Sequence, residues 1–150
     1  MKFELKKFHE NRGHEGLGYD CELWMDGKLA AHCNNEGGGG PDMIWYATPE
    51  MQRKVESHIA TLPPYHWGEE DFHLDDSPMT IDLLMMTLIT EMQTNKAFKR
   101  QCKTKTLFRL KGDAADEYHS SKQVFTPKIA EGIRKHYGDQ LLEIINERFL

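Results

Sequence analysis

The sequence lacks the features of a membrane-spanning, exported or disulfide-stabilised protein. No apolar run approaches the ~20 residues that cross a bilayer, and the longest, 81–89, is interrupted by Asp82 and Thr87. The N-terminal residues contain no apolar core of the kind found in a signal peptide. The three cysteines are an odd number, which argues against a disulfide framework. We therefore expect a cytoplasmic protein without a membrane partner.

The chain also lacks an excess of positive charge. It contains 19 Lys and Arg and 24 Asp and Glu residues, which gives a formal net charge of −5. This net charge provides no overall attraction to nucleic acid or to a membrane. The charges are nevertheless segregated, because an acidic stretch at 69–76 precedes a basic stretch at 96–111 that contains no acid. Two interpretations stay open for 96–111: a solvated segment, or a surface for a phosphate-bearing or acidic partner, nucleic acid included.

What is present predicts a single α+β domain over residues 1–150. Hydrophobic residues make up 39% and charged residues 29% of the chain, which is typical of a folded globular protein. Apolar residues alternate with polar ones over 17–25, a pattern of period two that predicts a strand with one buried face. We expect strands over 2–8 and 17–35, the latter folded into a hairpin, and a short strand over 43–46.

The hairpin turn is marked by Asp26-Gly27. A three-residue loop over 25–27, with Gly27 in the left-handed region, would pair Leu23 with Leu29 and gather the apolar side chains on one face. A two-residue loop followed by regular pairing would scatter them, because a one-residue slip reverses every side chain. The pattern therefore predicts the three-residue loop with a glycine bulge, and it places Trp24 on the outer face.

Threonine–proline and serine–proline pairs predict where the helices begin. The expected helices are 49–60 after Thr48, 79–98 after Ser77, 127–137 after Thr126 and a last helix capped by Asp139. The second should be the most buried, with Met86 widening its apolar stripe. A strand is expected over 104–111, with 122–125 as its partner. The fold class is thus α+β, an N-terminal antiparallel β-meander packed against about four helices, with a further strand or hairpin near 104–125.

Four consecutive glycines, Gly37, Gly38, Gly39 and Gly40, follow the hairpin and run into Pro41-Asp42. Ordering them costs roughly several kcal/mol, so the fold must need them or use them. Phosphate-binding glycine loops lead directly into a helix, whereas a proline and a strand-like segment follow here, so no nucleotide-binding fold is expected. Two interpretations stay open: a turn that needs positive φ or close packing, or a loop that contacts a ligand or partner.

The hairpin and the glycine loop carry a family resemblance. Asp26-Gly27-Lys28 followed by Asn34-x-Glu-Gly-Gly-Gly-Gly-Pro resembles small uncharacterised proteins of bacteriophages and their hosts, in which a similar turn precedes an Asn-x-Gly-x-Gly-Gly loop. The resemblance covers 17–42 and, more loosely, 105–109, 137–139 and 145–147. Here Glu36 and Gly37 stand where the pattern has a single spacer. The resemblance implies a phage-type origin and a location in the host cytosol, but no mechanism.

No complete catalytic or metal-binding constellation is visible in the sequence. There is no Gly-x-Ser-x-Gly motif, and His9 and His14 are five residues apart, which places them on different faces of a helix. Cys21 and Cys33 are expected to be small buried hydrophobes. The loop at 65–76 combines histidines with carboxylates, for which a solvated acidic loop is the simpler interpretation. We expect no metal and no cofactor.

Two functional hypotheses follow. The first is a binding protein that contacts a host macromolecule such as a protein, or a small anionic ligand, without turnover, because exposed aromatics anchor interfaces. Its candidate residues are Trp24, Asn34, Asn35, Gly37, Gly38, Gly39, Gly40, Asp42, Trp67, Arg109 and Lys111. The alternative is a small enzyme acting on a nucleotide or phosphoester, with His119 or His32 as general base and Arg109, Lys111 or the glycine loop holding phosphate. The sequence does not indicate the oligomeric state.

Overall fold

The computed structural model describes residues 2–13, 15–67, 75–114 and 117–150. The chain forms two compact units, Met1–Thr90 (unit 1) and Glu91–Leu150 (unit 2), and the boundary falls inside one continuous helix, α2 (Ile81–Gln101). The single domain expected from the sequence stays a prediction. No helix among the described residues is both long and apolar enough to cross a membrane.

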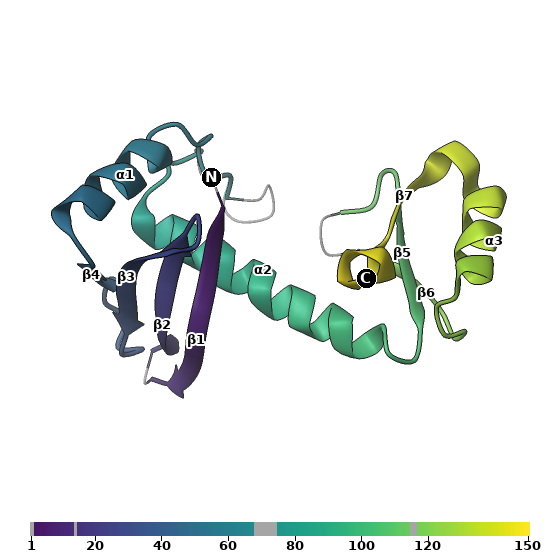
Figure 1. The fold of residues 1–150 in the computed structure, drawn as a ribbon, viewed down its shortest axis with the longest axis horizontal. Helices are drawn as coiled ribbons and strands as arrows, with labels where there is room; N and C mark the ends of the chain where they lie inside the picture. The colour runs from purple at the N-terminus through teal and green to yellow at the C-terminus, as the bar shows by residue number, and fades with distance from the viewer. Residues whose placement is uncertain (1, 14, 68–74, 115–116) are drawn as a thin grey trace. The chain divides into compact units, whose positions relative to one another are not determined.

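Unit 1 is built on a four-stranded antiparallel sheet whose strands lie in chain order (Figure 1). The strands are β1 (Phe3–Arg12), β2 (Leu17–Met25), β3 (Lys28–Asn35) and β4 (Met43–Tyr46). Side chains of α1 (Pro49–Ile59) and of the first half of α2 join Leu23, Cys21 and Cys33 in one buried cluster on the inner face. The α+β class and the N-terminal antiparallel meander are therefore confirmed.

The hairpin between β2 and β3 corrects the predicted register. Asp26 and Gly27 both have positive φ, 51° and 79°, and Met25 pairs with Lys28, so the turn has two residues and the predicted three-residue loop is wrong. The bulge lies further along: Trp24 pairs with Leu29 but Leu23 pairs with Ala31. This extra residue returns the apolar side chains to one face. The positive φ of Gly27 and the outward, half-buried position of Trp24 agree with the prediction.

Helix α1 begins as predicted, whereas α2 does not. The Thr48 hydroxyl accepts a hydrogen bond from the Met51 amide at 3.0 Å and caps α1. Helix α2 begins at Ile81 with the Thr80 hydroxyl accepting from the Leu83 amide at 3.2 Å, because Ser77 instead pairs with Tyr65 in an isolated β-bridge. Met86 is 40% exposed, so the buried stripe is narrower than predicted. Most of the loop expected over 65–76 lies outside the described residues.

Unit 2 centres on a three-stranded antiparallel sheet in the order β6 (His119–Ser121), β5 (Thr106–Leu110), β7 (Leu141–Ile144). Successive residues of β5 point to opposite faces. Leu107 packs with Phe98 of α2 and with Ile145. Phe108 packs on the other face with Ala130 of α3 (Pro127–Tyr137), the helix that lies beside this sheet in Figure 1. Leu107 and Phe108, adjacent in the sequence, are therefore both buried, one on each face of β5.

Two predictions for unit 2 are wrong. The partner of β5 on one side is 119–121, not 122–125. The last helix expected after Asp139 is replaced by a 3₁₀ turn, η1 (Gly138–Gln140), the strand β7 and a second 3₁₀ turn, η2 (Ile145–Phe149). The described residues therefore form three α-helices and not about four. Helix α3 has the predicted bounds, with Thr126 as its N-cap, and Gly138, which follows it, has φ 53°.

Candidate functional site

The glycine-rich loop is held in shape from inside by Asn35. The Asn35 Oδ1 atom accepts a hydrogen bond from the Gly37 amide at 2.8 Å. Its Nδ2 atom donates to the Gly40 carbonyl at 3.2 Å and to the Asp42 carboxylate at 3.0 Å. The Gly37 amide is therefore occupied by a side chain of the protein, so it does not offer its N–H to an anionic ligand. The Asn35 side chain therefore fixes the conformation of the loop and does not extend outward from it.

Close backbone packing and positive φ explain two of the four glycines. A Cβ at Gly37 would lie 2.6 Å from Gly13 Cα, and φ is 75° there. The Gly37 carbonyl accepts from the Glu15 amide at 2.9 Å, which ties the loop to the β1–β2 connection. Gly39 has φ 81°, where a Cβ would meet the flexible Glu15 side chain. Gly37 and Gly39 thus have structural reasons, which supports the first of the two interpretations of this loop.

The other two glycines, Gly38 and Gly40, have space around them for a side chain. A Cβ at Gly38 or Gly40 would have no heavy atom within 4 Å, and neither residue has positive φ. Both are exposed. That Gly38 and Gly40 contact a ligand or partner stays a prediction. The same is true of Asn34, which is half-buried on the adjoining strand β3.

The Asp42 carboxylate affects the pKa of two other groups of unit 1. Asp42 is half-buried and held by Asn35, and Asp82 is in the first turn of α2. Burial and then the Asp42 charge raise the pKa of Asp82. The same two causes raise the pKa of Tyr19, whose buried hydroxyl has no hydrogen-bond partner among the described residues. Sequence reasoning named Asp42 but missed Tyr19 and Asp82.

The outer face of the sheet in unit 1 carries a row of polar and aromatic side chains. Lys6 pairs with Glu22, Glu22 with His32 and His32 with Trp45, so the row crosses all four strands. Trp24 lies on the same face, with the Lys6 ammonium 3.9 Å from its ring centroid. His32, proposed above as an alternative general base, is exposed here and points away from the buried thiols.

Strand β4 adds exposed apolar surface to this face. Trp45 is 55% exposed and Met43 is 51% exposed, and they alternate with the half-buried Ile44 and Tyr46. Sequence reasoning did not include either residue among the candidates. The strand predicted over 43–46 was the available signal, because every second residue of a strand with one covered face points outward.

The candidates of unit 2 lie around a partly buried ion-pair cluster. The His119 Nε2 atom is 3.2 Å from Asp113 Oδ2, and the His119 ring stacks on Phe108. Hydrogen bonds to Leu110 and His119 lower the pKa of Asp113. Arg109 donates to the carbonyls of Glu117 and Ala114 and pairs with Glu143 at 3.5 Å, whereas Lys111 is exposed. The structure thus brings His119 and Arg109 into one neighbourhood, while His32 and the glycine loop belong to unit 1.

Trp67 is half-buried and fixed in place. Its indole N–H donates to the Ser77 hydroxyl at 2.8 Å, and its ring contacts Tyr65 edge-on. Phe72, which follows it in the sequence, lies outside the described residues. Trp67 therefore stabilises the closure of this loop, and its role in binding stays a prediction.

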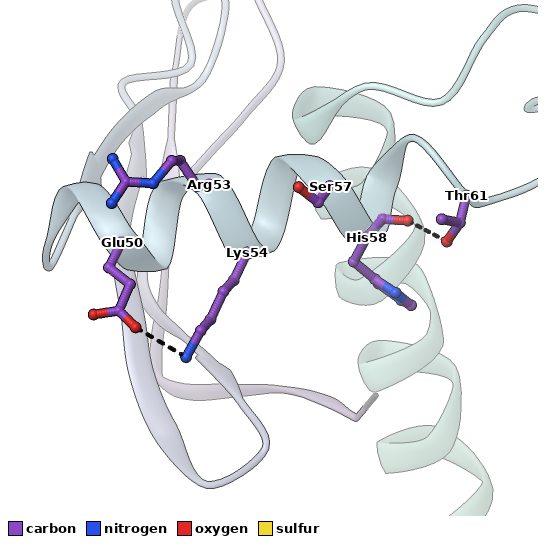
Figure 2. A pocket seen from close by; sticks show the side chains of 6 residues that line it. All are labelled: Glu50, Arg53, Lys54, Ser57, His58 and Thr61. Carbon is purple, nitrogen blue, oxygen red and sulfur yellow. Dashed lines mark hydrogen bonds and ion pairs between the residues drawn. The ribbon is translucent and has the colours of Figure 1, made fainter.

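Helix α1 carries an exposed hollow of about 400 Å³ (Figure 2). Its lining comes from α1 and the residues that follow it, including Glu50, which pairs with Lys54 at 3.4 Å, and Thr61, which donates to the His58 carbonyl at 2.6 Å. Ser57 and Arg53 point along the helix surface and not toward a common centre (Figure 2). The interactions within the hollow are local and solvent-exposed, so it offers no convergent site.

Cys21 and Cys33 are both buried, as expected from the sequence. Cys21 lies directly opposite Cys33, and both are free thiols. Contact with the Cys21 thiol, together with burial, raises the pKa of Cys33, so this thiol stays protonated and inert. In the described ranges, no three or more His, Cys, Asp or Glu side chains gather closely enough to hold a metal.

Comparison of the chain with protein-family models, curated proteins and solved structures finds no match.

Proposed function

We propose that this protein is a binding protein without turnover, and that it contacts a partner protein through strand β4 and the outer face of the unit 1 sheet. The observation that carries the proposal is the exposure of Met43 and Trp45 on a strand at the end of the sheet order. Large exposed aromatics anchor protein interfaces. The resemblance of residues 17–42 to phage-type proteins supports a host protein as the partner.

The two edge strands of this sheet differ in a way that favours β4. Strand β1 carries several charges and a bulge near Lys7, whose φ is 53°, and both features discourage pairing with another chain. Strand β4 has the sequence Met-Ile-Trp-Tyr, without a charge or a proline. An extended segment of the partner can add to β4 through main-chain hydrogen bonds, with its side chains against Met43 and Trp45.

The test is affinity capture from host cells with two matched variants. Met43 and Leu142 are both 51% exposed, so Met43→Lys and Leu142→Lys remove the same amount of exposed apolar surface in different units. We expect a host protein that is retained by the wild type and by Leu142→Lys but bound at least about tenfold more weakly by Met43→Lys. Equal retention by all three, or no specific protein retained by the wild type, contradicts the proposal.

A second copy of the chain is the competing occupant of this edge, and sedimentation distinguishes it. A β4–β4 pair would make the isolated protein a symmetric dimer that Met43→Lys converts to a monomer. We expect the isolated wild type to sediment as a monomer. A dimer sensitive to Met43→Lys would assign the edge to self-association and overturn the assignment to a host protein.

The alternative is a small phosphoester-acting enzyme, favoured by the contact of His119 with Asp113 next to Arg109. A carboxylate that orients an imidazole is the usual support of a general base. The measurement is hydrolysis of a chromogenic phosphodiester by the wild type and by His119→Ala. Turnover that disappears in His119→Ala would establish the enzyme, and equal rates at the uncatalysed level would exclude this dyad.

A further inference from the structure

We propose that unit 2 binds a small planar aromatic anion in a groove between helix α3 and strand β6. The ligand class is an aromatic ring system that carries a carboxylate, sulfonate or phosphate group. The groove has a volume of about 790 Å³, within the range of roughly 300–1,000 Å³ that is usual for small-molecule sites. It belongs to unit 2, whereas the protein interface proposed above, around β4, belongs to unit 1.

Helix α3 lines the groove with two adjacent rows of residues. Lys128, Gly132 and His136 recur at intervals of four, so they lie on one face of the helix. The neighbouring row, one residue further along, is apolar and consists of Ile129, Ile133 and Tyr137. Eight helical residues rise about 12 Å, so each row is long enough to lie along a molecule of two or three rings.

Aromatic and aliphatic side chains form the inner wall of the groove. Phe108 of β5 packs in one cluster with Ile133 and Tyr137. The Tyr137 ring centroid lies 5.0 Å from that of Phe108 and 4.7 Å from that of His136. Aromatic rings at such separations attract one another beyond the effect of buried area. A planar ring in the groove therefore meets an aromatic surface.

The polar groups of the groove select a negative charge. Lys128 and His136 are exposed, and neither takes part in the ion pairs of unit 2 among the described residues. No described residue that lines the groove carries a carboxylate. On the opposite wall, the Ser121 hydroxyl accepts from the Gln123 amide at 3.3 Å, so its own proton can be donated to an anion.

Gly132 gives a second, independent indication of a ligand. A glycine inside a helix destabilises it relative to alanine. The described part of the fold gives no reason for this glycine, because φ is not positive there and a Cβ would have no heavy atom within 4 Å. Gly132 lies between Lys128 and His136 on the lining face. Its missing side chain lets a flat ring approach the helix backbone closely, which is a common use of glycine.

The experiment is fluorescence titration of the full chain with anilinonaphthalene sulfonate, an aromatic anion, and with N-phenylnaphthylamine, which has the same rings without the sulfonate. We expect one saturable site per chain that binds the sulfonate several-fold more tightly than the uncharged dye. Gly132→Leu should raise the melting temperature by about 2–4 °C, because leucine favours the helix. The same variant should abolish binding at dye concentrations that saturate the wild type, because the new side chain occupies the groove.

Lys128→Gln tests the charge, with Lys135→Gln as the matched control. Both lysines are exposed on α3, but only Lys128 lines the groove. We expect Lys128→Gln to weaken the sulfonate several-fold and to leave the uncharged dye unaffected, while Lys135→Gln changes neither. Naphthalene carboxylate and adenosine monophosphate, added as competitors, distinguish a carboxylate ligand from a phosphate ligand, and displacement of the dye by either supports the proposal.

Four results would overturn the proposal. The wild type shows no saturable binding, or neither competitor displaces the dye. Gly132→Leu binds the dye as the wild type does, or the two lysine variants weaken it equally, which would indicate attraction to the helix surface as a whole. A wild-type dimer in sedimentation that Gly132→Leu dissociates would assign the groove to a second copy of the chain.

Discussion

Substitution of Gly37 by alanine tests whether the glycine-rich loop is needed for its shape. The substitution forces a side chain into the left-handed region at φ 75°, which costs about 1–2 kcal/mol. The new Cβ would also lie 2.6 Å from Gly13 Cα, a contact with backbone that costs roughly a further 1–3 kcal/mol. We expect a loss of about 2–5 kcal/mol in the free energy of unfolding, which lowers the urea midpoint by roughly 1–2 M.

Tryptophan fluorescence is the appropriate probe, because all three tryptophans (Trp24, Trp45 and Trp67) belong to unit 1. Gly38→Ala is the matched control: no heavy atom lies within 4 Å of its added Cβ and φ is not positive. It should leave stability unchanged or raise it by about 0.4–1 kcal/mol. If Gly37→Ala and Gly38→Ala unfold at the same urea concentration, the structural explanation of Gly37 is wrong.

Three further predictions concern unit 2 and the whole chain. Asn146→Leu should destabilise the protein by about 2–4 kcal/mol, because the buried Asn146 side chain accepts from the Leu107 amide at 2.7 Å and donates to the Lys105 carbonyl at 2.9 Å; far-UV circular dichroism measures the loss. Hydrogen bonds from Arg148, and then Arg109, lower the pKa of Glu143, so its carboxylate stabilises the fold above an ordinary pKa of about 4.3, and that stabilisation disappears as the pH falls through the lowered value. Glu143→Gln should therefore make the melting temperature depend less steeply on pH at acidic pH. An unchanged pH dependence would contradict this assignment. If the chain is one cooperative domain, tryptophan fluorescence and far-UV circular dichroism should give coincident unfolding curves, and separate midpoints would establish two domains.

Local signals in the sequence predicted much of unit 1. The Thr48-Pro49 pair located α1, and the alternation over 17–25 located the buried face of β2, because both signals depend on neighbouring residues alone. The predicted register of the hairpin was wrong, because the register depends on the position of the bulge. Keeping the apolar side chains on one face requires one extra residue in the hairpin. In the structure this residue lies in β3, between the partners of Trp24 and Leu23, and not in the turn.

The misassigned end of the chain shows the limit of periodicity. Apolar residues at 141, 142, 144, 145 and 149 fit a helical spacing, but a short apolar run fits a strand equally well. Pairing of Phe108 with Ile144 and the hydrogen bonds of Asn146 to the start of β5 decide for strand and 3₁₀ turn. These contacts join residues nearly 40 positions apart, so local spacing carried no information about them.

Photo-crosslinking from strand β4 tests the central proposal most directly. A photoreactive phenylalanine derivative replaces Trp45 in one variant and Leu142 in the other, both exposed apolar positions, and the variants are irradiated inside host cells. The proposed interface predicts a discrete adduct with a host protein from position 45 and none from position 142. The proposal is contradicted if position 45 gives no adduct, or if both positions capture the same proteins.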